Sequence, residues 1–411
     1  MARGRSGKSF AGAALITFVT LLSACDSDSL MPPQPAGGSM FARYAAIGNS
    51  ITAGFQSGGI NDSTQMQSYA VLLAKQFGLT VGEDFNVPLL NMPGCPPPII
   101  DIFTQTRVAG GSSTDCALRQ IPTPTSLNNA AVPGAAVIDA LTNLDLSSDP
   151  NALTTLFLGG RTQLELVREV RPTFVTIWLG NNDVLGSLLN SGDPGAANLI
   201  TSPTDFATRY SAMMDSLDAI GTIQGGVALG VVQVVAAPFA SLGGAYFLAA
   251  QVIPTLTVLP NCLDAAPIPG STDSAHVLVP FPFGGLLMAQ AAAGVPTTLD
   301  CSVPQVVTVP EALNMITTVA QYNTTIQVEA EKRDWIFLDP NILLRQLQAD
   351  PSAIRPFPAF DPADPGHIVA PFGSALSRDG FHPSAATHVM VANTIIDAIN
   401  AKYGLNLLPV Q

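Results

Sequence analysis

The chain has 411 residues, of which 47% are hydrophobic and 11% are charged, and its formal net charge is −13 at pH 7. So much apolar material excludes a largely disordered chain. The acidic balance argues against a nucleic-acid-binding protein, which needs a basic face to displace counterions. The length allows two domains, or one large domain with insertions.

The first 24 residues have the pattern of an export signal. Basic residues precede an apolar run from Ala11 to Leu22, which is too short to span a bilayer comfortably. The run ends in Ser23-Ala24-Cys25, and small residues before a cysteine at this place resemble a bacterial lipoprotein signal, with Cys25 lipidated after cleavage. An ordinary secretory signal with an incidental cysteine is the alternative.

The lipoprotein interpretation predicts an exported protein that the lipid on Cys25 anchors to the cell envelope. Residues 25–40 are polar and rich in proline and glycine, as a tether from lipid to domain would be. The folded domain would then span residues 41–411. The sequence does not decide between the periplasmic face of the inner membrane and the outer membrane.

Four cysteines lie outside the signal: Cys95, Cys116, Cys262 and Cys301. An even number in an exported chain indicates disulfides. Pairing of nearest neighbours, Cys95 with Cys116 and Cys262 with Cys301, would close two local loops, and the other connectivities stay open. Metal binding is the alternative, but no histidine or further cysteine lies at close ligand spacing to them. We therefore predict no metal site.

Strand-like and helix-like patterns alternate along the domain. Strands are expected at Tyr44–Ile47, Ser126–Gly134, Phe174–Leu179, Val227–Val235 and Trp335–Asp339, and helices at Ser68–Phe77, Thr162–Val170, Thr204–Ile220, Pro310–Lys332 and Pro383–Gly404. Pro383 would lie in the first turn of the last helix. Such alternation predicts an α/β fold, with a parallel sheet and helices on both of its faces.

Two stretches interrupt this alternation. Residues 91–124, rich in proline, glycine, serine and threonine, are predicted to form an insertion loop, and a second, apolar insertion spans about 239–310. No charged residue occurs between Gly225 and Leu263, so a membrane helix is one interpretation. Pro238 and Pro254 divide this run, which favours a strand followed by an apolar insertion. The insertion could serve as a lid, as a pocket for an acyl chain, or as extra packing on the sheet.

Polar residues follow several of the predicted elements. Ser50 lies two residues after Gly48 at the end of the first strand, Gly134 ends the second, and Asn182 follows the third. Asp379 and His382 precede the last helix. Acyl transfer needs such a set: a histidine takes the proton of a serine hydroxyl, a carboxylate orients the histidine, and N–H donors meet the developing oxyanion.

Four blocks of this chain resemble the SGNH (GDSL) hydrolase family: Gly48-Asn49-Ser50, Asn128–Ala135, Gly180–Asp183 and Asp379–Pro383. They stand in the family's order and cover most of the chain from Phe41 onward. The resemblance implies a flavodoxin-like three-layer sandwich whose parallel sheet has the strand order 2-1-3-4-5. It also implies a catalytic triad of Ser50, His382 and Asp379. The sequence contains no metal-ligand set and no phosphate loop, so no cofactor is expected.

The same resemblance assigns the oxyanion hole to the Ser50 N–H, the Gly134 N–H and the Asn182 side chain. The family's aspartate before the nucleophile is Asn49 here, and its following leucine is Ile51. Neither change removes a catalytic group, but Asn49 could hold the nucleophile loop differently. Asp183 is expected to shape its loop. The remaining histidines, His276, His367 and His388, are expected to be structural or solvated.

These features predict an exported serine esterase or lipase that hydrolyses carboxylic esters through an acyl-enzyme. The apolar insertions suggest medium or long acyl chains. The alternatives are a glycan O-deacetylase or a phospholipase of the same family, and a surface lipoprotein that binds a partner and has lost catalysis. The ester substrate, and the membrane through the lipid on Cys25, are the only partners that the sequence suggests.

Overall fold

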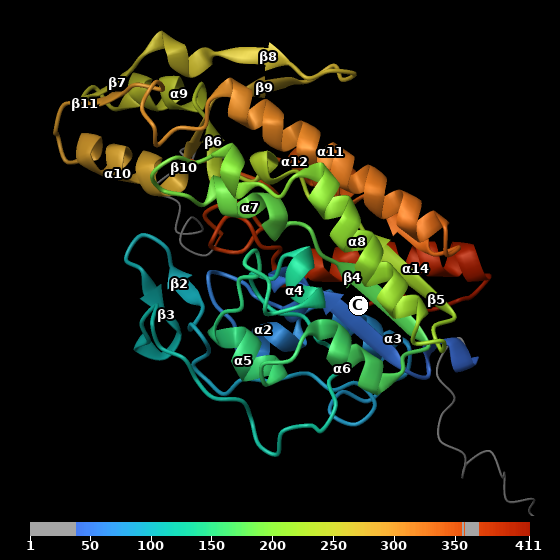
Figure 1. Cartoon of the computed structure of the whole chain (residues 1–411). Helices are drawn as coiled ribbons and strands as arrows, with labels where there is room; N and C mark the ends of the chain where they lie inside the picture. Colours follow the sequence, from blue (N-terminus) through green and yellow to red (C-terminus); the bar gives the residue numbers. More distant parts are fainter. Residues whose placement is uncertain (1–37, 356, 358–369) are drawn as a thin grey trace, which may run out of the picture. The chain divides into compact units, whose positions relative to one another are not determined.

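A four-stranded parallel sheet forms the centre of the computed structural model, which describes residues 38–355, 357 and 370–411 (Figure 1). The predicted signal and Cys25 lie outside these residues, as does His367. The strand order is β1-β4-β5-β12, and the strands are β1 Tyr44–Gly48, β4 Phe174–Trp178, β5 Gly225–Leu229 and β12 Ile336–Leu338. Every residue of β1, β4 and β5 is buried, as expected of a parallel sheet covered on both faces.

The predicted strand Ser126–Gly134 is the first correction, because only one residue pair of it, Asn129 with Ala46, forms a β-bridge. The segment still runs beside β1: the Ala46 N–H donates to the Asn128 carbonyl, and the Val132 N–H donates to the Gly48 carbonyl. A regular ladder does not form, because the side-chain amide of Asn128, and not a backbone N–H, donates to the Tyr44 carbonyl. Counted second in chain order, this segment gives the expected order 2-1-3-4-5.

Helices cover both faces of the sheet, so the predicted α/β three-layer architecture is confirmed. Alternate residues of β1 enter different cores: Ala45 and Ile47 pack on one face, Tyr44 and Ala46 on the other. The first core includes helices α4 Val137–Leu141, α6 Gln163–Val170, α8 Pro203–Asp218 and α11 Val309–Glu331, and the second includes α3 Tyr69–Gln76 and α14 Ala385–Tyr403.

The helix ends follow local capping chemistry. Thr162 and Glu165 form the predicted reciprocal capping box that begins α6. Helix α14 begins later than predicted, because Ser384 is its N-cap and Pro383 therefore lies outside the first turn. Helix α12, Pro340–Gln348, was not foreseen. The further helices are α1 Ser50–Ala53, α2 Asp62–Met66, α5 Ala152–Leu158, α7 Asn182–Leu188 and α12 Pro340–Gln348, with 3₁₀ turns at Gly38–Phe41, Val108–Gly110, Ala197–Leu199, Val234–Ala236 and Pro260–Leu263.

Strand β5 ends at Leu229, six residues before the predicted end at Val235. Beyond that point, asparagine side chains form the hydrogen bonds that a neighbouring strand would otherwise form with the backbone. Asn323 of α11 accepts from the Val231 N–H and donates to the Val231 carbonyl. The N–H groups of residues 232 and 233 donate to Asn181 and Asn341. The backbone is thus satisfied without a neighbouring strand, and residues 230–237 leave the sheet as a loop.

The second insertion forms a lobe, which we define as residues 239–307, built from short elements (Figure 1). Its strands pair as β6 with β10, β7 with β11, and β8 with β9. Among the described residues, no helix is both long enough and apolar enough to cross a membrane. The lobe contains β6 Ala240–Leu242, α9 Ala245–Val252, β7 Leu256–Val258, β8 Ala265–Pro267, β9 Ser274–His276, β10 Leu278–Pro280, α10 Phe281–Ala292 and β11 Thr297–Leu299.

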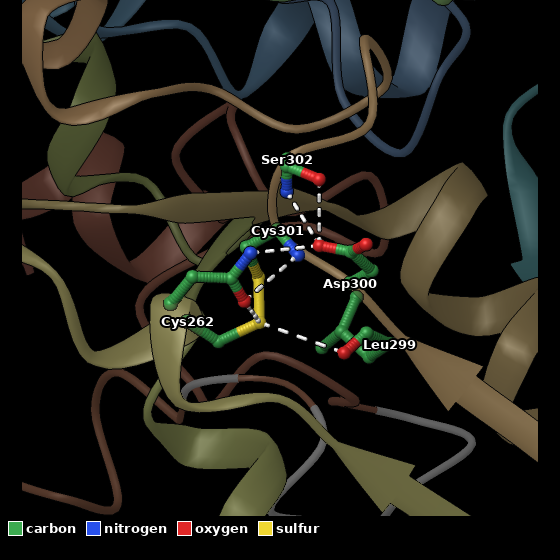
Figure 2. The surroundings of a disulfide bond; sticks show 6 residues. Cys262, Leu299, Asp300, Cys301 and Ser302 are labelled. Atoms are coloured by element: carbon green, nitrogen blue, oxygen red, sulfur yellow. Dashed lines mark hydrogen bonds between the residues drawn. A yellow bond between two sulfur atoms is a disulfide. The ribbon is translucent and has the colours of Figure 1, made fainter.

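Both insertions are closed by disulfides with the nearest-neighbour pairing, Cys95–Cys116 and Cys262–Cys301. The first insertion also contains a small hairpin of β2 Ile99–Asp101 and β3 Thr106–Arg107. Figure 2 shows that the second disulfide lies beside Asp300, whose carboxylate accepts from the backbone and the hydroxyl of Ser302.

Candidate active site

Ser50 is the first residue of α1, two residues after the end of β1 and at the carboxyl end of the sheet. A tight turn places it there. A Cβ on Gly48 would lie 2.1 Å from the Thr52 hydroxyl oxygen, so this position has room only for glycine. Asn49 is the N-cap, and its side-chain oxygen accepts from the Ile51 N–H at 3.1 Å. The cap leaves the hydroxyl of Ser50 free to face the loop before α14.

Ser50, His382 and Asp379 form a continuous hydrogen-bonded series. The His382 Nε2 atom lies 2.9 Å from the Ser50 hydroxyl oxygen, and its Nδ1 atom lies 2.8 Å from a carboxylate oxygen of Asp379. Phe55 packs against the imidazole, with ring centroids 5.0 Å apart. The structure thus brings together the three residues to which the sequence assigns a triad.

Both carboxylate oxygens of Asp379 accept several hydrogen bonds. One carboxylate oxygen accepts from the Gly58 N–H in addition to His382, and the other accepts from the Ser377 hydroxyl and the Phe381 and His382 N–H groups. Burial alone would raise the pKa of Asp379, but the His382 charge and these hydrogen bonds outweigh it and hold the pKa well below its usual range. Asp379 is therefore ionised and fixed in orientation.

Sequence reasoning missed Gly58 and Ser377, which support this carboxylate. Ser377 also accepts from the Ser57 N–H, so the loop after α1 is tied to the loop that contains Asp379 and His382. These two loops are more than 300 residues apart in the chain. A turn glycine and a single serine give no local signal of such a contact.

The predicted oxyanion donors Asn182 and Gly134 differ in their position relative to the cleft that contains Ser50. Asn182, the first residue of α7, lines the same cleft as Ser50 and His382. Its amide donates one hydrogen to the Ala135 carbonyl and retains a second. Gly134 has a φ of +89° and a solvent-exposed backbone, but it is not among the residues that line this cleft.

Asp183 connects the loops of the two predicted donors. Its carboxylate accepts from the Val137 N–H at 3.0 Å, so the segment after Gly134 is bound to the start of α7. Burial raises the pKa of Asp183 to about 6, an effect that this hydrogen bond only partly offsets. Ionising this buried carboxyl group is unfavourable in the folded state. The free energy of unfolding should therefore fall as the pH rises from the ordinary pKa of an aspartate, 3.8, toward 6.

The remaining histidines lie away from the cleft or outside the described residues. His388 is fully buried, its Nδ1 atom accepts from the Tyr69 N–H, and burial lowers its pKa to about 3. It is a neutral core residue, as the sequence suggested. His276 is exposed in β9 of the lobe.

The cleft beside Ser50 is small, with a volume of about 60 Å³. Its wall includes Asn181, Val232, Ala237 and Phe381. Asn181 also accepts from the Val232 N–H, which fixes the loop after β5 against the start of α7. The arrangement can deliver a proton from the serine hydroxyl to the imidazole while a carbonyl group lies against the Asn182 amide.

Comparisons with known proteins give only distant structural similarities. No family model matches the chain, and no curated protein matches it. An acetylxylan esterase from Geobacillus stearothermophilus aligns with 13% identity over 90% of this chain and 97% of its own, with a TM-score of 0.38. A lipase/acylhydrolase from Enterococcus faecalis aligns with 12% identity over 89% and 98%, with a TM-score of 0.34. At such values the chemistry of this chain must be argued from its own site.

Proposed function

We propose that this protein hydrolyses carboxylic esters with Ser50 as the nucleophile. The observation that carries the proposal is the unbroken series from the Ser50 hydroxyl through His382 to Asp379, with contacts of 2.9 and 2.8 Å. A serine hydroxyl is a weak nucleophile until a base within hydrogen-bond distance accepts its proton. The ionised Asp379 fixes the tautomer of that base and stabilises the imidazolium that forms.

The reaction then has two halves. Ser50 attacks the ester carbonyl while its proton passes to His382, and the resulting oxyanion is met by the Ser50 N–H and the Asn182 amide. Collapse of the tetrahedral intermediate releases the alcohol, which takes the proton from His382. Water activated by the same imidazole then hydrolyses the acyl-enzyme and restores the serine.

Labelling of the purified protein with a fluorophosphonate probe tests whether Ser50 is activated. We expect one covalent label per chain, on Ser50, because the probe reacts with serines that a neighbouring base has activated. A surface lipoprotein that has lost catalysis would not be labelled, and this outcome would exclude the proposal. Comparison of aryl esters, O-acetylated glycans and phospholipids as substrates would then separate a general esterase from a glycan O-deacetylase or a phospholipase.

We also propose that the chain is exported and lipidated on Cys25. The apolar run that ends in Ser23-Ala24-Cys25, followed by a tether rich in proline and glycine, supports this proposal. In a bacterial host, radiolabelled palmitate should enter the wild-type protein and remain with the membrane fraction. The Cys25→Ser variant should incorporate no label, and equal labelling of the two proteins would contradict lipidation at this residue.

A further inference from the structure

An apolar cavity of about 90 Å³ lies next to the cleft of Ser50. Four residues line both spaces: Ile51, Val232, Ala237 and Phe381. Ile51 directly follows the nucleophile and Phe381 directly precedes the base. The shared wall therefore borders both Ser50 and His382.

The far wall of this cavity comes from three elements at the carboxyl end of the sheet. Trp178 is the last residue of β4, Leu343 and Leu347 belong to α12, and Val391 belongs to α14. The cavity thus borders the carboxyl end of β4. The sequence alone could not indicate it, because α12 was not foreseen.

The side chains that line the cavity provide almost no hydrogen-bond partners for a polar ligand. Its one hydroxyl group, on Thr387, already donates to the Ala375 carbonyl at 2.6 Å. The other lining side chains are aliphatic or aromatic, apart from the prolines. A sugar hydroxyl placed here would lose its hydrogen bonds to water without replacement, whereas an alkyl chain would lose none.

The space continues beyond this cavity. A groove of about 430 Å³ along the edge strand β12 shares Trp178, Pro340, Leu343 and Val391 with it. The three spaces thus follow one another from Ser50, past Phe381 and Trp178, to the outer edge of the sheet. Such a succession of spaces suits a linear chain that is longer than the first cavity.

The lobe offers a competing apolar space of about 530 Å³, lined by residues that include Phe281 and Leu286. That space shares no lining residue with the cleft of Ser50. The lobe contacts the active-site loop elsewhere, where Phe239 packs on Phe381 with ring centroids 4.1 Å apart. The sequence suggested the lobe as a pocket for an acyl chain, but no residue of the lobe lines the cleft of Ser50.

We infer that the cavity between α12 and α14 binds the acyl chain of the substrate, and that the preferred substrates are esters of straight-chain, medium-length fatty acids. This inference rests on the proposed function of Ser50. Each methylene that enters the apolar space should favour the transition state by roughly fourfold, the equivalent of the usual transfer free energy of one methylene group. The acyl chain passes Phe381 and lies against Leu343 and Trp178.

The test is a series of p-nitrophenyl esters from acetate to octanoate. For the wild-type protein we expect kcat/KM to rise along the series. Leu343→Trp, which fills the cavity, should lower the ratio of octanoate to acetate activity by about tenfold or more. Leu286→Trp places the same side chain in the competing space of the lobe and should leave the ratio unchanged. A fall in the ratio with Leu286→Trp but not with Leu343→Trp would overturn the inference.

A binding measurement keeps the inference testable if Leu343→Trp does not fold. Trp178 lines the cavity, and the only other tryptophan, Trp335, belongs to the core on the opposite face of the sheet. In the Ser50→Ala protein, an ω-brominated octanoate should quench tryptophan fluorescence, and Trp178→Phe should abolish the quenching. Quenching that persists in Trp178→Phe would place the ligand elsewhere and contradict the inference.

The two hypotheses fail in different ways. If Ser50→Ala retained acetate hydrolysis, the proposed function would be wrong whatever the chain-length profile. If acetate hydrolysis depended on Ser50 but activity fell steadily from acetate to octanoate, the ester hydrolase would stand and the acyl site would be wrong.

Discussion

Ser50→Ala should lower kcat/KM for p-nitrophenyl esters by at least about a thousandfold, because the acyl-enzyme can no longer form. The residual rate would come from substrate binding and the oxyanion donors alone. The Ser50 side chain is small and lies at the first position of a short helix. The substitution therefore removes one hydroxyl group and one hydrogen bond, to His382 at 2.9 Å, and should leave the fold intact.

Ser191→Ala is the matched control for this experiment. Ser191 is exposed in the loop after α7, so its loss should change neither activity nor stability by a measurable amount. His382→Ala should resemble Ser50→Ala, whereas the exposed His276 can be replaced without effect. Equal activity of the wild type, Ser50→Ala and His382→Ala would exclude the mechanism.

Asp379→Asn should lower kcat by about 10³- to 10⁴-fold, although the substitution is nearly isosteric. The carboxylate fixes the His382 tautomer in which Nε2 faces Ser50, and an amide that donates toward Nδ1 would favour the opposite tautomer. The N–H group of the new amide would also face a group that itself donates, such as the Gly58 N–H, and two donors cannot form a hydrogen bond with each other. Asp193→Asn, in an exposed loop, is the control with the same chemistry.

The same variant should show a pH-dependent loss of stability. The pKa of Asp379 is lower in the fold than its ordinary value of 3.8, so ionisation of this group stabilises the folded state above that pH. That contribution is lost as the pH falls through the folded-state pKa. Chemical denaturation should therefore show a gap between wild type and Asp379→Asn at pH 7 that narrows near pH 3. A gap that widened on acidification would contradict the assignment.

The motif residues could be found from the sequence because they stand in four short blocks that resemble those of a known hydrolase family, and because these blocks lie at turns beside predicted elements. Gly48 and Ser50 stand at a sharp strand-to-helix turn, and Asp379 and His382 precede an amphipathic helix. Each of these patterns depends on neighbours within a few residues. The buried runs of β1 and β4 were equally clear, because a parallel sheet covered on both faces needs continuous apolar strands.

The elements that were missed depend on partners far away in the chain. The loop after β5 looks like more strand, since residues 231–235 are mostly valine. Only Asn323 and Asn341, about a hundred residues later, show why the backbone leaves the sheet there. Helix α12 was missed although it starts with a proline at an Asp339 cap, and with it the apolar cavity behind Phe381.

The distance along the chain between Ser50 and His382 has a consequence for biosynthesis. The two residues are separated by 332 positions, and Asn323 and Asn341, which fix the cleft wall, also lie far beyond Ser50 in the chain. A ribosome therefore makes Ser50 more than 300 residues before His382. Under the proposed mechanism the nascent protein has no assembled triad until His382 has been made, and a chain that stops before this residue would be inert toward the esters of the cell that makes it.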